Sequence, residues 1–262
     1  MNMTQPPEEN YAPPTPPSPP SQPQMVPVSL PTAIPRVTYT ILGITVVAYL
    51  LQLLSQFIFG QDLMIALGAK SNAAIRAGQL WRFFTPMLLH GSILHIGFNM
   101  YALYIIGIGV ERRFGHGRFL LLYILSGFAG SVFSFLLSNA DSIGASGAIF
   151  GLIGAEGIFL YHNRKMLGNQ VKRAINNVIF IVVLNLLLGL SPGIDNWAHV
   201  GGLMGGLIFA WFAGPLWEVR GIAPSLHVVD QREPRDIFVG SAVVAIIFCT
   251  LAAIGMWFPF VK

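Results

Sequence analysis

Two polar residues stand in apolar stretches of this sequence, in surroundings that suit nucleophilic chemistry. Ser146 lies in the run Gly-Ala-Ser-Gly at 144–147, and His199 lies in the run Ala-His-Val-Gly-Gly at 198–202. Polar groups within long apolar segments are costly and usually have a function. A serine hydroxyl beside an imidazole is the minimal activated nucleophile. The two runs therefore predict a Ser146–His199 dyad.

A second polar pair could stabilise the charge that such chemistry develops. His95 and Asn99 are four residues apart, so a helix would place them one above the other on the same face. Both side chains can donate hydrogen bonds, and such donors stabilise a developing oxyanion. We therefore expect His95 and Asn99 to face the reacting group.

These residues must be positioned by membrane helices, because the composition excludes an ordinary water-soluble domain. Hydrophobic residues make up 54% of the 262 residues and charged residues 10%, with a mean hydropathy of +0.64. Soluble proteins carry about 25% charged residues. The single cysteine, Cys249, allows neither an internal disulfide nor a cysteine-based metal site. The sequence predicts an all-α, polytopic transmembrane bundle in a lipid bilayer.

Seven apolar runs after Arg36 are long enough, or nearly long enough, to cross a bilayer, which takes about 20 helical residues. The predicted spans are Val37–Phe59, Pro86–Val110, Phe119–Ser138, Ile143–Tyr161, Ala174–Leu190, Trp197–Trp217 and Ile237–Phe258. Residues 36–262 then form one transmembrane domain. Residues 1–35 hold most of the 18 prolines and predict a disordered tail.

The distribution of lysine and arginine predicts the orientation of the chain. On the side of Arg36 and the loops 111–118, 162–173 and 218–236 there are 11 basic residues, against four on the other side. Basic loops stay in the cytoplasm. We expect a cytoplasmic N-terminus and an external C-terminus. Basic residues scattered in this way suit membrane topology better than nucleic-acid binding.

With this orientation, Ser146 and His199 each lie a few residues below the outer surface, on spans that both enter from outside. Glycines on the two spans would let the helices approach closely. His95 lies about nine residues into the second span, unless that span begins above the membrane. The long outer loop 60–85 is apolar, and its Trp81 and Arg82 suit an interfacial position beside the bundle.

Taken together, these motifs resemble those of the rhomboid proteases over about residues 37–258. The family's Gly-x-Ser-Gly motif is found at 144–147, its His-x-x-x-Asn pair at His95 and Asn99, and its Ala-His-x-x-Gly-x-x-x-Gly motif at 198–206. Loop motifs match at Trp81-Arg82 and at Glu111 with Gly115. Five motifs in the family's order are a far more specific signal than one.

The resemblance implies an intramembrane serine endopeptidase with a six-helix core, here followed by a seventh span. Ser146 would be the nucleophile and His199 the general base, while His95, Asn99 and the Ser146 backbone N–H would form the oxyanion hole. Phe150 stands where many relatives have a tyrosine stacked on the histidine. The supporting residues would be His90, Gly144, Gly147, Phe150, Gly202, Gly206, Trp81 and Arg82.

The resemblance further implies transmembrane proteins as substrates, a multi-pass location in the cell (plasma) membrane, and no cofactor. Because a serine protease needs an extended backbone at the scissile bond, a helical substrate would have to unwind locally. Cleavage is expected near the outer membrane face.

Three other interpretations compete. A rhomboid-like pseudoprotease would bind membrane clients without cleaving them, but that class lacks the serine or the histidine. A proton-coupled transporter would use Glu156, for which we instead expect a partner on a neighbouring span or a water-filled inner vestibule. A zinc site would need His90, His95 and His199, and a spacing of five would point the first two apart on a helix.

Overall fold

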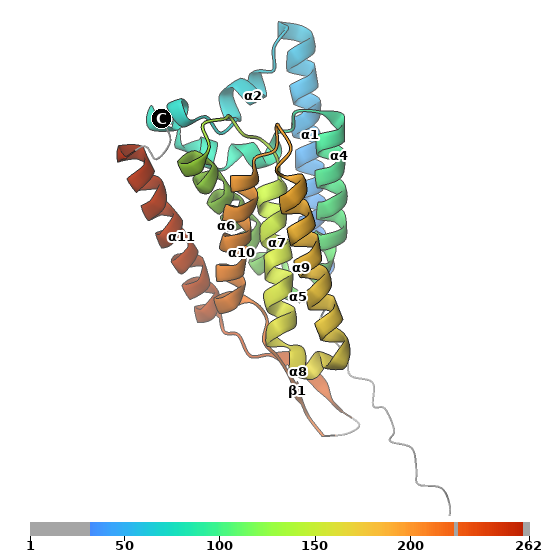
Figure 1. Ribbon diagram of the computed structural model, residues 1–262. Coiled ribbons are helices and arrows are strands. Elements are labelled where there is room, and N and C mark those ends of the chain that lie inside the picture. The colour runs from blue at the N-terminus through green and yellow to red at the C-terminus, as the bar shows by residue number, and fades with distance from the viewer. Residues whose placement is uncertain (1–31, 223–224, 259–262) are drawn as a thin grey trace, which may run out of the picture.

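The computed structural model describes residues 32–222 and 225–258. Figure 1 shows a bundle of long helices, with the start of α1 at one end and the end of α11 at the other. The long helices are α1 (Arg36–Phe59), α6 (His116–Leu137), α7 (Ser146–His162), α9 (Val171–Leu188), α10 (Asn196–Ala213) and α11 (Pro234–Trp257). The remaining crossing is made of α4 (Ile93–Ala102), the π-helical turn η3 (Leu103–Gly107) and α5 (Ile108–Phe114). Each of the seven predicted spans thus corresponds to a helix.

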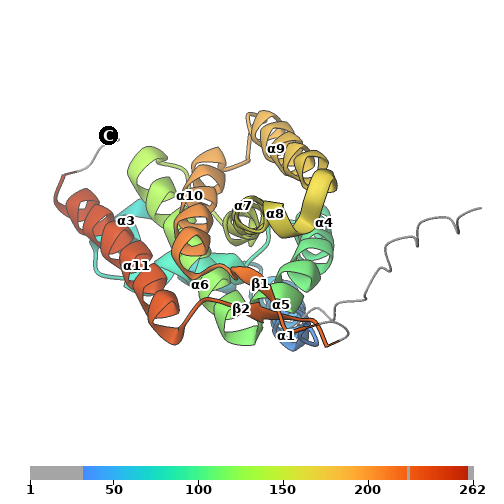
Figure 2. The ribbon, with the colours of Figure 1, turned by 90° about the horizontal axis from the view of Figure 1, so that it is seen from below.

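Five of these crossings are long and apolar enough to span a membrane by themselves. The helices α7 and α10 are shorter, with 17 and 18 residues, and are rich in glycine. Seen from below, α7 lies in the middle of the bundle (Figure 2). Most of α7 is buried among other helices, so it does not need a full lipid-facing length, whereas α10 keeps an exposed face that includes Trp197 and Trp211. The prediction of an all-α polytopic fold is confirmed.

The second crossing begins later than predicted, at Ile93 instead of Pro86. Residues 85–88 form a separate 3-10 turn, η2 (Thr85–Leu88), and the Ser92 side chain caps α4 by accepting from the His95 backbone N–H at 3.2 Å. Proline at 86 and glycine at 91 break the apolar run locally. His95 therefore lies in the first turn of its helix, at the same end of the bundle as Ser146.

The outer loop between α1 and α4 folds into short helices beside the bundle, drawn in cyan in Figure 1. They are α2 (Leu63–Gly68), α3 (Asn72–Arg76), η1 (Leu80–Phe83) and η2. Arg82 is buried and holds this loop, since its guanidinium donates to the carbonyl oxygens of Ala66 and Ala69, each at 2.7 Å. Trp81 donates to the Leu67 carbonyl at 3.0 Å and is half exposed. The interfacial position of this loop stays a prediction.

At the other end of the bundle, Glu111 fastens α5 to the start of α1. Its buried carboxylate accepts from Val37 N at 2.8 Å, Thr38 N at 2.7 Å and Thr38 Oγ1 at 2.6 Å. The ring of His116 contributes a further contact at 2.6 Å. A helix N-terminus has unpaired N–H groups, and this carboxylate satisfies two of them. Glu111 therefore has a structural role.

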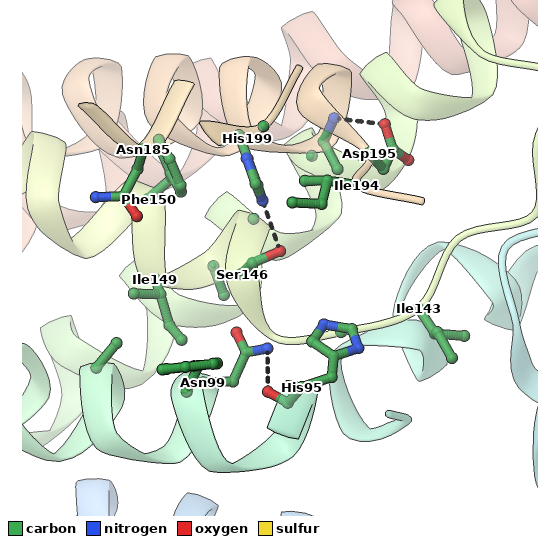
Figure 3. A pocket seen from close by; sticks show the side chains of 18 of the residues that line it. His95, Asn99, Ile143, Ser146, Ile149, Phe150, Asn185, Ile194, Asp195 and His199 are labelled. Carbon is green, nitrogen blue, oxygen red and sulfur yellow. Dashed lines mark hydrogen bonds between the residues drawn. The ribbon is translucent and has the colours of Figure 1, made fainter. Parts of the chain in front are cut away.

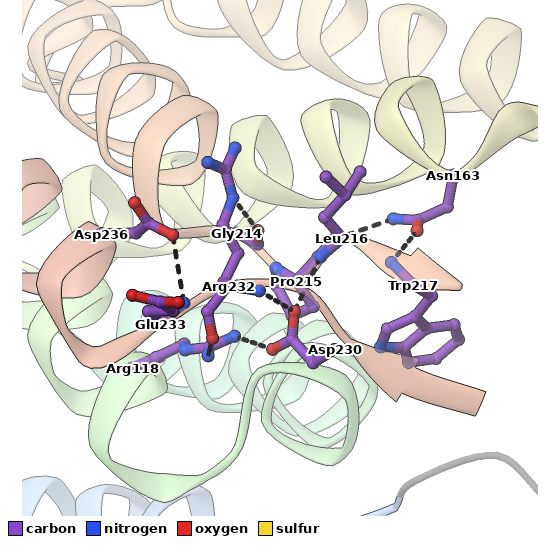
Figure 4. Close-up of polar contacts among 10 residues, drawn as sticks. All are labelled: Arg118, Asn163, Gly214, Pro215, Leu216, Trp217, Asp230, Arg232, Glu233 and Asp236. Atoms are coloured by element: carbon purple, nitrogen blue, oxygen red, sulfur yellow. Dashed lines mark hydrogen bonds and ion pairs between the residues drawn. The ribbon is translucent and has the colours of Figure 1, made fainter. Parts of the chain in front are cut away.

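The same end carries a two-stranded hairpin that the sequence did not predict. Strand β1 (Trp217–Arg220) pairs antiparallel with β2 (His227–Asp230), and two short turns, α8 (Arg164–Leu167) and η4 (Gly168–Gln170), connect α7 to α9. Asp230 binds Arg118 and accepts from Leu216 N at 3.0 Å (Figure 4). Arg232 donates to the Trp211 carbonyl at 2.8 Å. The hairpin is thus fastened to α6 and α10.

Candidate active site

Ser146 and His199 meet at one end of the bundle. Ser146 is the first residue of α7, and its Oγ lies 3.0 Å from Nε2 of His199 in α10 (Figure 3). His199 is buried, and within the described residues its other ring nitrogen has no hydrogen-bond partner. When that nitrogen carries the ring proton, Nε2 accepts from the hydroxyl, which is the arrangement a general base requires.

Glycine allows the two helices to bring these side chains together. A Cβ atom at Gly202 would lie 2.0 Å from the carbonyl oxygen of Gly147, and one at Gly206 would lie 2.1 Å from that of Gly151. Since no side chain fits between them, α7 and α10 pack backbone to backbone. This contact fixes the depth and rotation of Ser146 relative to His199.

One neighbour holds the imidazole of His199, and another caps the start of its helix. The ring of Phe150 stacks on it, with centroids 4.3 Å apart and planes 8° from parallel. Asp195 caps α10 by accepting from Ala198 N at 3.1 Å, and it also binds the hydroxyl of Ser134 in α6. Asp195 was not predicted as a site residue, although an aspartate just before an apolar helical run is a recognisable capping signal.

His95 and Asn99 lie across the cavity from His199, with Ser146 between them (Figure 3). Asn99 donates one amide N–H to the His95 carbonyl at 3.0 Å, which leaves its second N–H available. Gly144 has a φ of +124°, and a Cβ there would lie 2.7 Å from His95 Nε2. The loop before Ser146 is therefore in direct contact with this pair.

His90 lies outside the helix, so the expectation that it points away from His95 is wrong. The ring centroids are 5.0 Å apart, and the ring planes meet at 68°. Residues 89–92 are not helical, so helical spacing does not separate the two side chains. His90 is buried, and its backbone exchanges two hydrogen bonds of 3.0 Å with the Gln52 side chain of α1. His90 is thus held by α1 and packs against His95 of the site.

The cavity around these residues has a volume of about 850 Å³. It is lined by Ser146 and His199, by His95 and Asn99, and by apolar side chains of two facing elements. Those side chains come from α4 with η3 and from α9, and they include Phe98, Tyr101, Ile105, Ile181 and Leu188. No residue of α9 is buried, so this helix is the least buried wall of the cavity. An apolar chain could occupy the space between α4 and α9 and reach Ser146.

The other residues singled out in the sequence lie away from this cavity. Trp81 and Arg82 belong to the outer loop, and Gly202 and Gly206 face α7. Glu156 binds Arg113 of α5, which confirms the expected partner on a neighbouring crossing. Within the described ranges no three histidine, cysteine or acidic side chains come close enough to hold a metal ion.

Comparison with known proteins agrees with this architecture. The Rhomboid domain model matches residues 77–216. Rhomboid protease GluP of Bacillus subtilis (strain 168) is 40% identical over 177 residues, which cover 67% of this chain and 34% of GluP. RHOMBOID-like protein 1 of Arabidopsis thaliana is 42% identical over 173 residues, covering 65% of this chain and 42% of the relative.

The chain therefore spans well under half the length of these two relatives. Rhomboid protease AarA of Providencia stuartii is covered more fully: it is 33% identical over an alignment of 195 positions, which covers 65% of this chain and 69% of AarA. The domain match and this coverage, together with the helical bundle, show that the chain belongs to the rhomboid family.

Proposed function

We propose that this chain is an intramembrane serine endopeptidase that cleaves transmembrane segments of other membrane proteins. The observation that carries the proposal is the 3.0 Å contact between Ser146 Oγ and His199 Nε2, at the edge of a cavity large enough for a peptide segment. The names of GluP and AarA describe both as rhomboid proteases, which supports the same activity here.

In the first half of the reaction, Ser146 Oγ attacks the carbonyl carbon of the scissile peptide bond. His199 Nε2 takes the hydroxyl proton, and the carbonyl oxygen becomes an oxyanion. Collapse of this intermediate breaks the C–N bond, and the proton on His199 passes to the leaving amine. An acyl-enzyme on Ser146 and a new amino terminus remain.

In the second half, a water molecule replaces the amine. His199 takes a proton from that water as its oxygen attacks the acyl carbon, and it then returns the proton to Ser146 Oγ. The products are a carboxylic acid and free enzyme. Because His199 and water carry every proton, the reaction needs no cofactor, and EDTA should leave turnover unchanged.

The oxyanion forms on the side of Ser146 where His95 and Asn99 lie. The free N–H of Asn99, a ring N–H of His95 and the backbone N–H of Ser146 are its donors. Donors that are already oriented in a site with little water stabilise such a charge strongly, since they need no rearrangement during the reaction. The supporting observation is that these residues line one cavity with Ser146.

The substrate enters between α4 and α9 as a transmembrane helix and unwinds near the outer membrane face. The apolar lining of this gap suits a segment arriving from lipid. The site lies at the end of the bundle opposite the basic loops, so the N-terminus is cytoplasmic and the C-terminus external, in the plasma membrane. Reporter fusions at Lys165 and Lys262 should report opposite sides, and the same side for both would contradict this topology.

A labelling and cleavage experiment tests the activity. Wild type, reconstituted in liposomes with a generic transmembrane substrate, should release product and should react with a fluorophosphonate at Ser146. Ser146→Ala should do neither while still binding the substrate. If wild type binds the substrate but neither cleaves nor becomes labelled, the chain is a pseudoprotease and the proposal is wrong.

A further inference from the structure

Lys70, in the outer loop between α2 and α3, is fully buried, although lysine is almost never fully buried unless it is paired. Its Nζ donates to the carbonyl oxygens of Ser138 at 3.0 Å and Ala140 at 2.9 Å. Its main chain pairs with Ser142 in both directions, at 2.9 and 3.0 Å. Residues 138–142 are therefore bound by this one lysine, through both its side chain and its main chain.

The direct contacts of the Lys70 ammonium are with backbone carbonyls, and it forms no ion pair with any residue in the described part of the chain. Helix α6 ends at Leu137, so the two carbonyls that Lys70 binds directly follow its C-terminal end, where a cation is favoured. Asn72 adds a third bond, from Nδ2 to the Ser138 carbonyl at 2.9 Å. Together these bonds fasten the end of α6 to the outer loop.

The ammonium form prevails at neutral pH. Burial lowers the pKa of Lys70 to about 8, while the carboxylates of Asp195 and Asp141 raise it and the guanidinium of Arg76 lowers it slightly. At pH 7 most molecules therefore keep the charge that these carbonyls face.

The fastened segment leads directly to Ser146. Only Ile143 separates Ser142, held by Lys70, from Gly144, whose N–H donates to the Pro86 carbonyl at 2.9 Å. Gly144 in turn lies so close to His95 that a Cβ atom would not fit between them. With both anchors in place, the chain has little freedom before α7 begins at Ser146. Release of one anchor would shift the Ser146 N–H relative to His95.

We propose that Lys70 is a positioning residue: it holds residues 138–144 so that the Ser146 backbone N–H and the His95 side chain converge on one oxyanion. This inference rests on the proposed function. Lys70 lies behind the cavity wall and touches none of the reacting groups. Its contribution is the geometry of donors that act in the transition state, so its loss should lower kcat and leave KM almost unchanged.

The test compares Lys70→Met with the matched variant Arg76→Met, which removes an exposed cation from the same loop. The kcat is expressed per Ser146 that reacts with a fluorophosphonate, so that misfolded molecules are not counted. A misplacement near 1 Å can cost about 10²-fold. We expect Lys70→Met to lower kcat by about tenfold or more, with KM within about twofold. Arg76→Met should match wild type, and Lys70→Arg should recover part of the loss.

One result would overturn the proposal: a kcat per reactive Ser146 in Lys70→Met that equals wild type, even where total activity falls because fewer Ser146 sites react. If Lys70→Met cannot be purified folded, Asn72→Leu, which removes one bond to the same carbonyl, decides the question. A lowered kcat in Asn72→Leu supports the proposal, and an unchanged one rejects it. Absence of cleavage by wild type would instead refute the proposed function, so the two failures are distinguishable.

Discussion

The carboxylates at one end of the bundle and the polar residues around the cavity at the other end are paired to different degrees. At the end with the hairpin, carboxylates are paired: Glu111 accepts three hydrogen bonds from α1, Glu156 binds Arg113, and Asp230 binds Arg118. At the other end, Ser146, His199, His95 and Asn99 surround a cavity and keep donors or acceptors unused. Fully paired groups stabilise one structure, whereas unpaired groups are available to a substrate. Substitutions around the cavity should therefore lower kcat, whereas substitutions at the paired end should lower the free energy of unfolding.

The largest effect should come from His199→Ala. Without the base, Ser146 keeps its proton, and kcat should fall by at least about 10³-fold, as in soluble serine proteases that lose a member of the catalytic group. The melting temperature in detergent should change little, because α7 and α10 pack through glycine backbone. Substantial turnover by this variant, measured on a transmembrane substrate, would disprove the dyad.

Asn99→Ala should come next, with a loss of about 10²-fold in kcat. KM should stay near wild type, since the oxyanion exists only in the transition state. Labelling of Ser146 by a fluorophosphonate should continue at a lower rate. His95→Ala should behave in the same way. If either variant melts early and yet turns over normally, the residue supports the helix packing and not the oxyanion.

Glu111→Gln, at the paired end, should show the reverse pattern. Replacing the buried carboxylate by an amide puts an NH₂ group in place of one oxygen, so that the N–H of either Val37 or Thr38 loses its acceptor and faces a donor. The free energy of unfolding should fall by about 2 kcal/mol, measured by thermal or denaturant unfolding in detergent. The kcat of the folded fraction should match wild type. A lowered kcat at unchanged stability would mean that the two ends are coupled.

The last effect concerns Lys70 and pH. Its pKa of about 8 in the folded chain lies below the ordinary value of 10.5, so the unfolded chain binds more protons between these two pH values. The free energy of unfolding should therefore rise with pH across that window. The melting temperature of wild type relative to Lys70→Met should increase from pH 7 to pH 10. A flat or falling difference would show that Lys70 is not buried as described.

The sequence predicted the helices well because a helix in a membrane must satisfy its own backbone, so apolar length alone locates it. It also predicted that Ser146 would meet His199, and their 3.0 Å contact agrees, while their catalytic roles remain a proposal. The prediction was wrong about the start of the second crossing, where proline and glycine divide one apolar run into a turn and a helix.

The features that were not predicted depend on contacts between distant parts of the chain. The hairpin is held by Arg118 and Asn163, which lie far from it in sequence. In the sequence, Lys70 looks like an ordinary basic residue of a loop. Only the fold shows that the end of α6 lies against it. Local pattern carries no information about either arrangement. Asp195 is different, since its capping position could have been recognised from the sequence alone.

The backbone contact between α7 and α10 has a consequence for inheritance. Gly202 and Gly206 lie too close to the carbonyl oxygens of the facing helix for any Cβ atom. Every amino acid that a single nucleotide change can put in place of glycine brings a Cβ atom. Every amino-acid substitution at these two positions, even to alanine, should therefore disturb the packing of α7 against α10. In a screen of random mutants, loss-of-function alleles should gather there, while the lipid-facing positions of α9 tolerate exchange among apolar residues.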